Sequence, residues 1–455
     1  MASHRYDLVI VGAGSGNTLK LHEFGGWRIA VVEADLFGGT CLNRGCIPSK
    51  MLVHTADVAS EIRDAGRFGI TATWGGADWS KIRERVFGRI DPLPALAREY
   101  RTKQGIDVYT GTARFVAPKV LRVGDDELHG DRFVLATGSR PKIPDVPGLA
   151  QVPYVTSDTV MRLTTRPAEM IILGGGYVAA EMAHIFGALG TAITIIERGD
   201  RLISRQDEDV SARFTEIYER RFDVRRNAAV VRASATGSRV RLDLTTPAGP
   251  QHVEADVLLV ATGRRPNSDT LDVAAGGLAV DAHGHVRTDD TLQTAVPGVW
   301  ALGDLANHFQ LKHMANAEAR VVWHNLAHPD NPRKATFPVV PAAVFADPQV
   351  ASAGATEQAL REQGRPYLAA TRPYGETAFG WALEDTTSFA KLLADPVTRQ
   401  LLGAHLIGPD ASILIQPLVQ AMCLGNTVDQ LAHEVLYIHP ALTEVVEQAL
   451  LRIDT

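Results

Sequence analysis

The chain has 455 residues, a formal net charge of −6 and 45% hydrophobic residues. A chain of this length forms several domains, because single domains average roughly 100 to 200 residues. Its interspersed charges form no basic patch, which argues against nucleic acid or a membrane surface as a partner, and no apolar run approaches the roughly 18 residues that span a bilayer.

The N-terminal segment runs directly into a short apolar strand without the pattern of a signal peptide, so we expect a cytoplasmic protein. Only three cysteines occur, too few for a secreted disulfide scaffold. Two of them, Cys41 and Cys46, are five positions apart. In a reducing compartment such a pair is more often catalytic or metal-binding than structural.

Residues 6–33 have the pattern of a dinucleotide-binding unit, a strand, a glycine-rich turn, a helix and a second strand. The predicted strands are Tyr6–Val11 and Ile29–Val32, and Glu33 follows the second. The turn contains Gly12, Gly14 and Gly16. Such a turn lets a pyrophosphate approach the backbone, the helix presents free N–H groups to it, and the acid accepts hydrogen bonds from a ribose. Asn17 stands where the fingerprint has its third glycine.

The same pattern returns in residues 170–197, which predicts a second dinucleotide. We expect strands at Met170–Leu173 and Ala192–Ile196 and a helix that ends near Leu189. The second turn contains Gly174 and Gly176, the helix has Ala179 and Ala183 at its tight-packing positions, and Glu197 ends the second strand.

The residues after the second unit bear on which nicotinamide cofactor is used. Arg198 can take a 2′-phosphate by paired charged hydrogen bonds, whereas Glu197 favours an unphosphorylated ribose. Arg201 and Arg205 add positive charge, so we favour NADPH over NADH. The alternative is that these arginines belong to a solvated loop.

Three further strands each run into a glycine turn. They are Phe133–Ala136 before Thr137 and Gly138, Val257–Val260 before Gly263 and Arg264, and Gly298–Leu302 before Asp304. A helix is predicted at Asn316–Ala327. From about Thr336 the pattern changes to strands such as Phe389–Leu393 and Leu401–Ile407 with helices near Gln416–Leu424 and Ala441–Arg452. The order predicts an α/β protein with two Rossmann-like dinucleotide-binding domains and an α+β C-terminal domain.

The cysteine pair can form a disulfide only if the chain bends between the two residues. In a regular helix, Cα atoms five positions apart are about 8 to 9 Å apart, beyond the range that a disulfide spans. Asn43 and Gly45 allow such a turn, and Pro48 suits the first turn of a helix that begins near Cys46. The helix dipole would then stabilise a Cys46 thiolate. The alternatives are half of a zinc site, which a second pair would have to complete, and two inert core cysteines.

Lys50 lies one turn after Cys46, where it can pair with a buried carboxylate. Near the C-terminus, His439 precedes a predicted helix whose first turn contains Glu444. Reduction of a disulfide expels a thiolate that needs a proton, and an imidazole oriented by a carboxylate is a natural donor. Taken alone, a histidine before a helix is more often structural. Cys423, in an apolar helix, is expected to pack.

Five strings together, GGTCLNRGCIPSK, GGGYVAAE, ATGRRPN, ALGD and HPALTE, resemble the pyridine nucleotide-disulfide oxidoreductases over essentially the whole chain. The resemblance implies FAD in a domain at 1–147 that a central domain at 267–335 completes, a nicotinamide cofactor at 148–266, and dimerisation through 336–455. It implies an enzyme that is an obligate homodimer, with no bound metal.

The resemblance also implies roles for single residues. Cys46 is the thiol next to the flavin and Cys41 the interchange thiol that attacks substrate, while His439 and Glu444 complete the site of the partner subunit. Lys50 and Glu181 resemble an ion pair beside the flavin. The implied FAD contacts are Gly12, Gly14, Gly16, Glu33, Thr40, Lys50, Thr137, Gly138 and Asp304. The implied nicotinamide-cofactor contacts are Gly174, Gly176, Tyr177, Ala179, Glu181, Glu197, Arg198, Gly263 and Arg264, with Tyr177 covering the nicotinamide pocket.

Within this family, the strings GSGN, FGRIDP, LKHMANAEARV and FGWALEDT are similar to one subgroup. The resemblance implies that the substrate is a small-molecule disulfide, that of mycothiol, a cysteine–glucosamine–inositol thiol. Two alternatives remain open. One is a lipoamide dehydrogenase or another low-molecular-weight disulfide reductase that uses NAD, and the other is a non-catalytic flavin-binding redox sensor.

Overall fold

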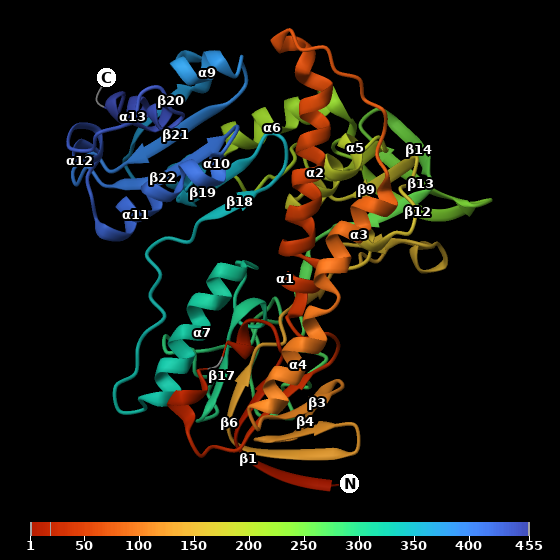
Figure 1. The fold of residues 1–455 in the computed structure, drawn as a ribbon, viewed down its shortest axis with the longest axis vertical. Helices are drawn as coiled ribbons and strands as arrows, with labels where there is room; N and C mark the ends of the chain where they lie inside the picture. Colours follow the sequence, from red (N-terminus) through yellow and green to blue (C-terminus); the bar gives the residue numbers. More distant parts are fainter. Residues whose placement is uncertain (1, 19, 454–455) are drawn as a thin grey trace.

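The computed structural model describes residues 2–18 and 20–453. Its first sheet has seven strands in the order β3-β2-β1-β6-β5-β4, and β17 pairs with the end of β6. The strands are β1 (Ala2–Val11), β2 (Ile29–Glu33), β3 (Asp107–Thr110), β4 (Ala113–Ala117), β5 (Val120–Val123), β6 (Asp126–Leu135) and β17 (Val299–Ala301). In the lower half of Figure 1, β17 returns from far along the chain to complete this sheet.

The strands at the centre of the first sheet are parallel, as a nucleotide-binding unit requires. Val9 in β1 lies opposite Ala30 in β2 and Phe133 in β6, and all three side chains are buried. Burial on both faces explains why these strands read as continuous apolar runs. The predicted strands are therefore confirmed here.

The helix that we predicted inside the first unit is wrong for the described residues. Between β1 and β2 the structure has two short 3₁₀ turns, η1 (Ser15–Asn17) and η2 (Leu21–Phe24). Only twelve positions separate Asn17 from Ile29, too few for a full helix and its return. The glycine-rich turn of this unit thus lacks a regular α-helix behind it, at least within 2–18 and 20–28.

The second unit has the predicted form. Its sheet is parallel throughout, in the order β11-β10-β9-β15-β8, and α5 begins directly after Gly176. The bounds are β8 (Val155–Thr156), β9 (Glu169–Leu173), α5 (Tyr177–Ala188), β10 (Ala192–Ile196), α6 (Glu208–Arg221), β11 (Asp223–Arg225) and β15 (Val257–Val260). A three-stranded antiparallel sheet follows, formed by β12 (Ala229–Thr236), β13 (Arg239–Thr246) and β14 (Gly249–Ala255). A separate two-stranded sheet pairs β7 (Ser139–Pro141) with β16 (Arg264–Pro266).

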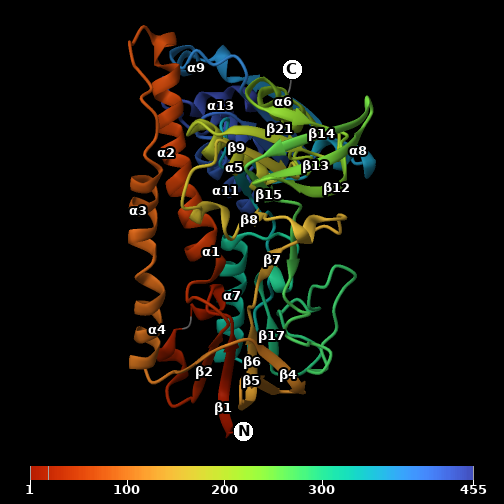
Figure 2. The same ribbon diagram turned by 90° about the vertical axis from the view of Figure 1, so that its right-hand side faces the viewer.

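Helices of the first domain extend along the second. They are α1 (Gly39–Arg44), α2 (Cys46–Asp64), α3 (Trp79–Ile90) and α4 (Leu93–Lys103). In Figure 2, α2 and α3 run side by side past α5. Leu52, Trp79 and Phe186 share one buried cluster, so burial of apolar side chains fixes α2 against α5. This packing decides where the start of α2 lies, and with it Cys46.

The C-terminal domain is an antiparallel sheet in the order β18-β19-β22-β21-β20, covered by short helices. The strands are β18 (Ala342–Val344), β19 (Val350–Gly354), β20 (Leu368–Pro373), β21 (Phe389–Ala394) and β22 (Leu401–Ile407). The helices are α8 (Glu357–Glu362), α9 (Ala378–Ala382), α10 (Ala411–Leu414), α11 (Gln416–Leu424), α12 (Val428–His433) and α13 (Thr443–Leu451). Figure 1 shows this domain to one side of α2.

The remaining helices are α7 (Lys312–Ala327), which begins one turn before the predicted Asn316, and the 3₁₀ turns η3 (Ala65–Phe68), η4 (Leu149–Gln151), η5 (Val160–Arg162), η6 (Gly303–Leu305) and η7 (Tyr374–Glu376). The α/β class with two Rossmann-like units and an α+β C-terminal domain is confirmed. None of the described helices is long and apolar enough to cross a membrane.

Candidate active site

The two cysteines lie on either side of a sharp break between helices. Cys41 is in α1, and Cys46 is the first residue of α2. The break is Gly45, whose backbone angles of φ −134° and ψ −117° separate the two helices. A Cβ on Gly45 would lie 3.0 Å from the carbonyl oxygen of Thr40, so a side chain would crowd the turn. The bent turn that a disulfide requires is therefore present.

We predicted that Asn43, like Gly45, allows the bend. The structure differs, because Asn43 lies inside α1. Its buried amide donates hydrogen bonds of 3.0 Å to the carbonyl oxygens of Phe37 and Gly39. The side chain thus ties α1 to the loop before it. Cys423 also differs from expectation, because it is exposed on α11 and does not pack in the core.

The structure contains the pair as free thiols with unequal acidity. A hydrogen bond from the Cys41 thiol and the charge of Lys50 lower the pKa of Cys46 to about 7, against the effect of burial. The same hydrogen bond, together with burial, raises the pKa of Cys41 far above its ordinary value. In the reduced pair, Cys46 is therefore the thiolate and Cys41 keeps its proton.

Lys50 and Glu181 meet at the contact between α2 and α5. Lys50 Nζ lies 2.7 Å from Glu181 Oε2. The other carboxylate oxygen accepts a 3.1 Å hydrogen bond from the backbone N–H of Phe345, whose ring lies 4.3 Å from Lys50 Nζ. Phe345 comes from the C-terminal domain and carried no sequence signal. It places a third segment of the chain against the ion pair.

Replacing Lys50 by methionine is expected to raise the pKa of Cys46, because the lysine charge stabilises the thiolate. The midpoint of Cys46 alkylation by iodoacetamide in the reduced protein should then move to higher pH, as followed by mass spectrometry of its peptide. Glu181→Gln should move it to lower pH, since the glutamate charge acts in the opposite direction. Equal midpoints in the wild type and Lys50→Met would contradict this assignment.

The first glycine-rich turn lies directly beside the cysteine segment. Gly38 donates a 2.9 Å backbone hydrogen bond to Ala13, and a Cβ on Gly39 would come within 2.9 Å of Gly14 Cα. Glu33 accepts hydrogen bonds from Ala13, at 2.7 Å, and from Asp35. The predicted ribose ligand therefore also holds the turn itself.

The surroundings of this turn fit FAD. A Cβ on Gly138, which has φ +67°, would meet nothing within 4 Å, so the backbone there is open to a ligand. The buried Thr137 Oγ1 has no hydrogen-bond partner among the described residues. Both residues follow β6, at the carboxyl edge of the sheet where nucleotides bind. A dinucleotide would supply the missing partner.

Asp304 lies at this edge in η6, where it accepts a 2.6 Å hydrogen bond from Ser139. Arg264, which we assigned to the nicotinamide site, donates to the same hydroxyl at 2.8 Å and to the Ser139 carbonyl oxygen at 2.7 Å. Its side chain is only 9% exposed, so it joins the two nucleotide domains. Glu318 was not predicted from the sequence, and its carboxylate accepts a 2.7 Å hydrogen bond from the backbone N–H of Gly303. Burial raises the pKa of Glu318 to about 7.

The second glycine-rich turn repeats the geometry of the first. Gly174 has φ +111°, and a Cβ there would lie 2.5 Å from the Ala261 carbonyl oxygen, while Cβ atoms on Gly176 or Gly263 would meet nothing within 4 Å. Glu197 accepts backbone hydrogen bonds of 2.6 Å from Gly175 and 2.7 Å from Gly199. The backbone of this turn is therefore open and fits a second dinucleotide. In the first turn of α5, Ala179 is buried and the Tyr177 side chain is 43% exposed.

Arginines near Glu197 differ in how far they are engaged. Arg201 lies 3.5 Å from Asp200 and donates to the carbonyl oxygen of Glu208. Arg198 and Arg205 are exposed and make no ion pair or hydrogen bond to any described residue. These two guanidinium groups are available to an anionic ligand.

His439 and Glu444 form a pair at the start of α13. His439 Nδ1 lies 2.8 Å from Glu444 Oε1, the carboxylate is nearly buried, and the imidazole is 72% exposed. The histidine has no hydrogen bond or ion pair to the described residues of the cysteine segment. In Figure 1, α13 lies well apart from α1. One chain therefore does not bring this pair to its own cysteines.

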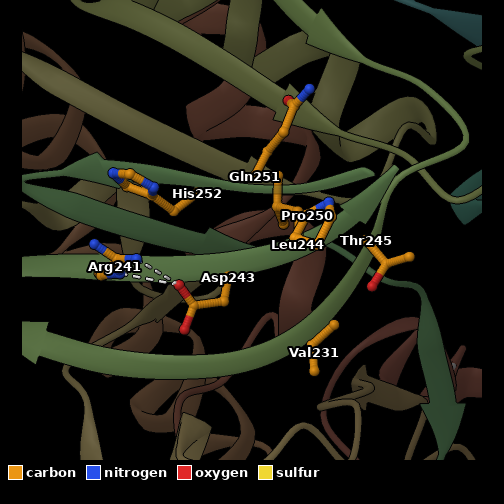
Figure 3. A pocket seen from close by; sticks show the side chains of 8 residues that line it. All are labelled: Val231, Arg241, Asp243, Leu244, Thr245, Pro250, Gln251 and His252. Carbon is orange, nitrogen blue, oxygen red and sulfur yellow. Dashed lines mark hydrogen bonds and ion pairs between the residues drawn. The ribbon is translucent and has the colours of Figure 1, made fainter. Parts of the chain in front are cut away.

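A surface hollow lies away from the cysteine segment. It has a volume of about 380 Å³ and lies on the three-stranded sheet β12–β14, between Val231, Arg241 and His252 (Figure 3). Arg241 in this hollow already pairs with Asp243 at 2.9 Å. It holds no part of the cysteine site.

Two nucleotide-binding units beside a dithiol are the parts of an oxidoreductase that passes electrons between a nicotinamide and a disulfide. The family profile described as pyridine nucleotide-disulphide oxidoreductase matches residues 6–319, and that of its dimerisation domain matches residues 340–450. The chain belongs to this family. The family is FAD-dependent and uses a pyridine nucleotide.

Known relatives extend over the whole chain. The chain is 43% identical to mycothione reductase from Mycobacterium tuberculosis, over 98% of this chain and 99% of that protein. It is 32% identical to dihydrolipoyl dehydrogenase from Chlamydia muridarum, over 99% and 97%. Among solved structures, the HOCl-induced flavoprotein disulfide reductase RclA from Escherichia coli superposes with a TM-score of 0.86 at 28% identity, over 98% of this chain and all of that one.

Proposed function

We propose that the protein reduces mycothione, the disulfide of mycothiol, to two thiols with electrons from NADPH. The observation that carries the choice of substrate is the 43% identity to a mycothione reductase over nearly the full length of both chains. The dihydrolipoyl dehydrogenase of similar coverage is 32% identical. The reductase class itself rests on the family and on the cysteine pair.

The chemistry begins with the reduced pair. Bound FAD supplies the relay of two electrons from the nicotinamide to the Cys41–Cys46 disulfide. Cys41 then loses its proton to a base and attacks one sulfur of the substrate, so that a mixed disulfide forms and the first thiolate leaves. That thiolate takes the proton from His439, which Glu444 orients.

Cys46 completes the cycle. Its thiolate, favoured by Lys50, attacks the sulfur of Cys41 in the mixed disulfide. The second product leaves as a thiolate and takes a proton from solvent, and the Cys41–Cys46 disulfide forms again. Two electrons and two protons, one of them from solvent, have then passed to the substrate, which balances the oxidation of one NADPH with the uptake of one proton.

The proposed homodimer supplies the histidine to each site, since His439 lies apart from the cysteines of its own chain. Leu436 and Ile438, just before it, are 97% and 75% exposed. Apolar side chains exposed to this extent indicate a surface that a partner covers. We also propose the division into parts at 1–147, 148–266, 267–335 and 336–455, with dimerisation through the last.

The preference for NADPH is proposed from Arg198 and Arg205, which are free to bind a 2′-phosphate. Glu197 does not by itself indicate NADH, because its carboxylate holds the glycine turn as Glu33 does in the first unit.

The double variant Arg198→Ala/Arg205→Ala is expected to raise the KM for NADPH about tenfold, through loss of charged hydrogen bonds, and to leave that for NADH unchanged. Steady-state kinetics with each cofactor measures this. Arg201→Ala is the matched control, since its side chain is already engaged. An equal change for both cofactors would refute a phosphate site here.

Oxidation of NADPH and NADH should be measured with mycothione, glutathione disulfide and lipoamide side by side. The proposal requires the highest kcat/KM with NADPH and mycothione. Faster turnover with NADH and lipoamide would instead establish the dehydrogenase alternative. A redox sensor would oxidise one equivalent of NADPH and stop with every disulfide.

A further inference from the structure

The two glycine-rich turns have different means of binding a pyrophosphate. Behind the second turn, α5 begins at Tyr177, and its first N–H groups and dipole face the turn. Behind the first turn, the described residues form η1, a single 3₁₀ turn of three residues. Such a turn has little dipole to offer, so the first site needs its positive charge from elsewhere.

A lysine from a distant segment reaches this turn. Lys312 is the first residue of α7, and its Nζ donates a 2.8 Å hydrogen bond to Ser15 Oγ, between Gly14 and Gly16. The side chain is half-buried. It forms no ion pair with a carboxylate among the described residues. A partly buried ammonium group without a carboxylate partner is well placed to receive an anionic ligand.

Two other contacts hold the turn in place. Arg101, only 8% exposed, donates a 2.5 Å hydrogen bond to the Asn17 carbonyl oxygen. Trp323, from the same helix as Lys312, donates to Thr18 Oγ1 at 3.2 Å. Arg101 therefore caps the carbonyl group of Asn17 at the point where a helix would have continued. Asn17, which replaces the third glycine, belongs to a 3₁₀ turn and not to a regular helix.

We propose that Lys312 binds the pyrophosphate of FAD and supplies the positive charge that a helix N-terminus would otherwise give at the first glycine-rich turn. The inference rests on the FAD dependence in the proposed function and adds a binding residue to it. A competing role exists, because the charge of Lys312 also acts on Cys41, lowering its pKa. The experiment must separate the phosphate end of FAD from its reactive end.

The test is the affinity of the full-length apoprotein for FAD, measured by flavin fluorescence, in the wild type and in Lys312→Met, Lys312→Gln and Lys312→Arg. Loss of a charge-assisted hydrogen bond predicts about a tenfold to hundredfold weaker FAD binding for Met and Gln, with most of the affinity kept by Arg. Lys103→Met, a solvent-exposed lysine at the end of α4, is the control for net charge and should bind FAD as the wild type does.

Two fragments locate the contact. ADP carries the pyrophosphate without the flavin, and riboflavin carries the flavin without phosphate. The proposal predicts that Lys312→Met weakens ADP binding as much as FAD binding and leaves riboflavin binding unchanged. A loss confined to riboflavin would overturn it and place the lysine at the reactive end. Full FAD affinity in Lys312→Gln, whose folding is checked by circular dichroism, would also overturn it.

These measurements use no disulfide substrate. If mycothione proved not to be the substrate, the affinities for FAD and ADP would be unaffected, so the two proposals fail independently.

Discussion

Replacing Cys41 by serine is expected to reduce disulfide turnover about a thousandfold or more, because serine cannot form the mixed disulfide with substrate. Reduction of FAD by NADPH should remain, since the role proposed for Cys41 is on the substrate side of the relay. The serine hydroxyl can still donate a hydrogen bond to the Cys46 thiolate, so the environment of Cys46 is preserved. Anaerobic stopped-flow absorbance measures flavin reduction, and steady-state oxidation of NADPH with mycothione measures turnover.

Cys423→Ser is the matched control for this variant. Cys423 is the third cysteine, exposed on α11, and has no assigned role. It should turn over as the wild type does. Retained turnover in Cys41→Ser, or loss of both flavin reduction and turnover, would refute the division of labour between the two cysteines.

Sequence reasoning succeeds where the chemistry depends on neighbours in the chain. The break at Gly45, the start of α2 at Cys46 and the open turns at Gly138 and Gly176 all follow from local residues. The parallel strands were also predictable, because their burial on both faces leaves continuous apolar runs. The family resemblance added the pairing of Lys50 with Glu181.

The sequence fails where two distant segments must meet. Phe345 covers Lys50 from the C-terminal domain, and Lys312 reaches Ser15 from the helix after β17. No local pattern marks either contact, since each depends on how the sheets are completed. The absence of a helix after Gly16 among the described residues had one signal, Asn17 in place of the third glycine. The short distance from Asn17 to Ile29 was the more informative feature.

The acidity of the pair explains why the site needs a base. In the reduced protein the proton stays on Cys41, whose pKa is raised by its hydrogen bond to Cys46 and by burial. Cys41 must lose this proton before it can attack a disulfide, and the first leaving thiolate must gain one. A single imidazole can perform both transfers in turn. His439, oriented by Glu444, has the exposure to do so in another chain.

His439→Gln is accordingly expected to lower turnover of mycothione by about two to four orders of magnitude, the usual worth of a positioned acid–base group. Flavin reduction by NADPH should be unchanged. Glu444→Gln should lower turnover less, because the histidine remains and loses only its orienting partner.

A mixed dimer of Cys41→Ser and His439→Gln subunits tests whether the histidine comes from the partner. If it does, both lesions fall in one site, and the other site combines the intact cysteines of one subunit with the intact histidine of the other. Subunits with different affinity tags, co-expressed and purified through both tags, should then recover about half the wild-type turnover per dimer, although either homodimer is inactive. If each site used its own histidine, both sites would carry a lesion and no activity would return. Recovery therefore requires the histidine to act across the interface, which is what its distance from α1 in the single chain implies.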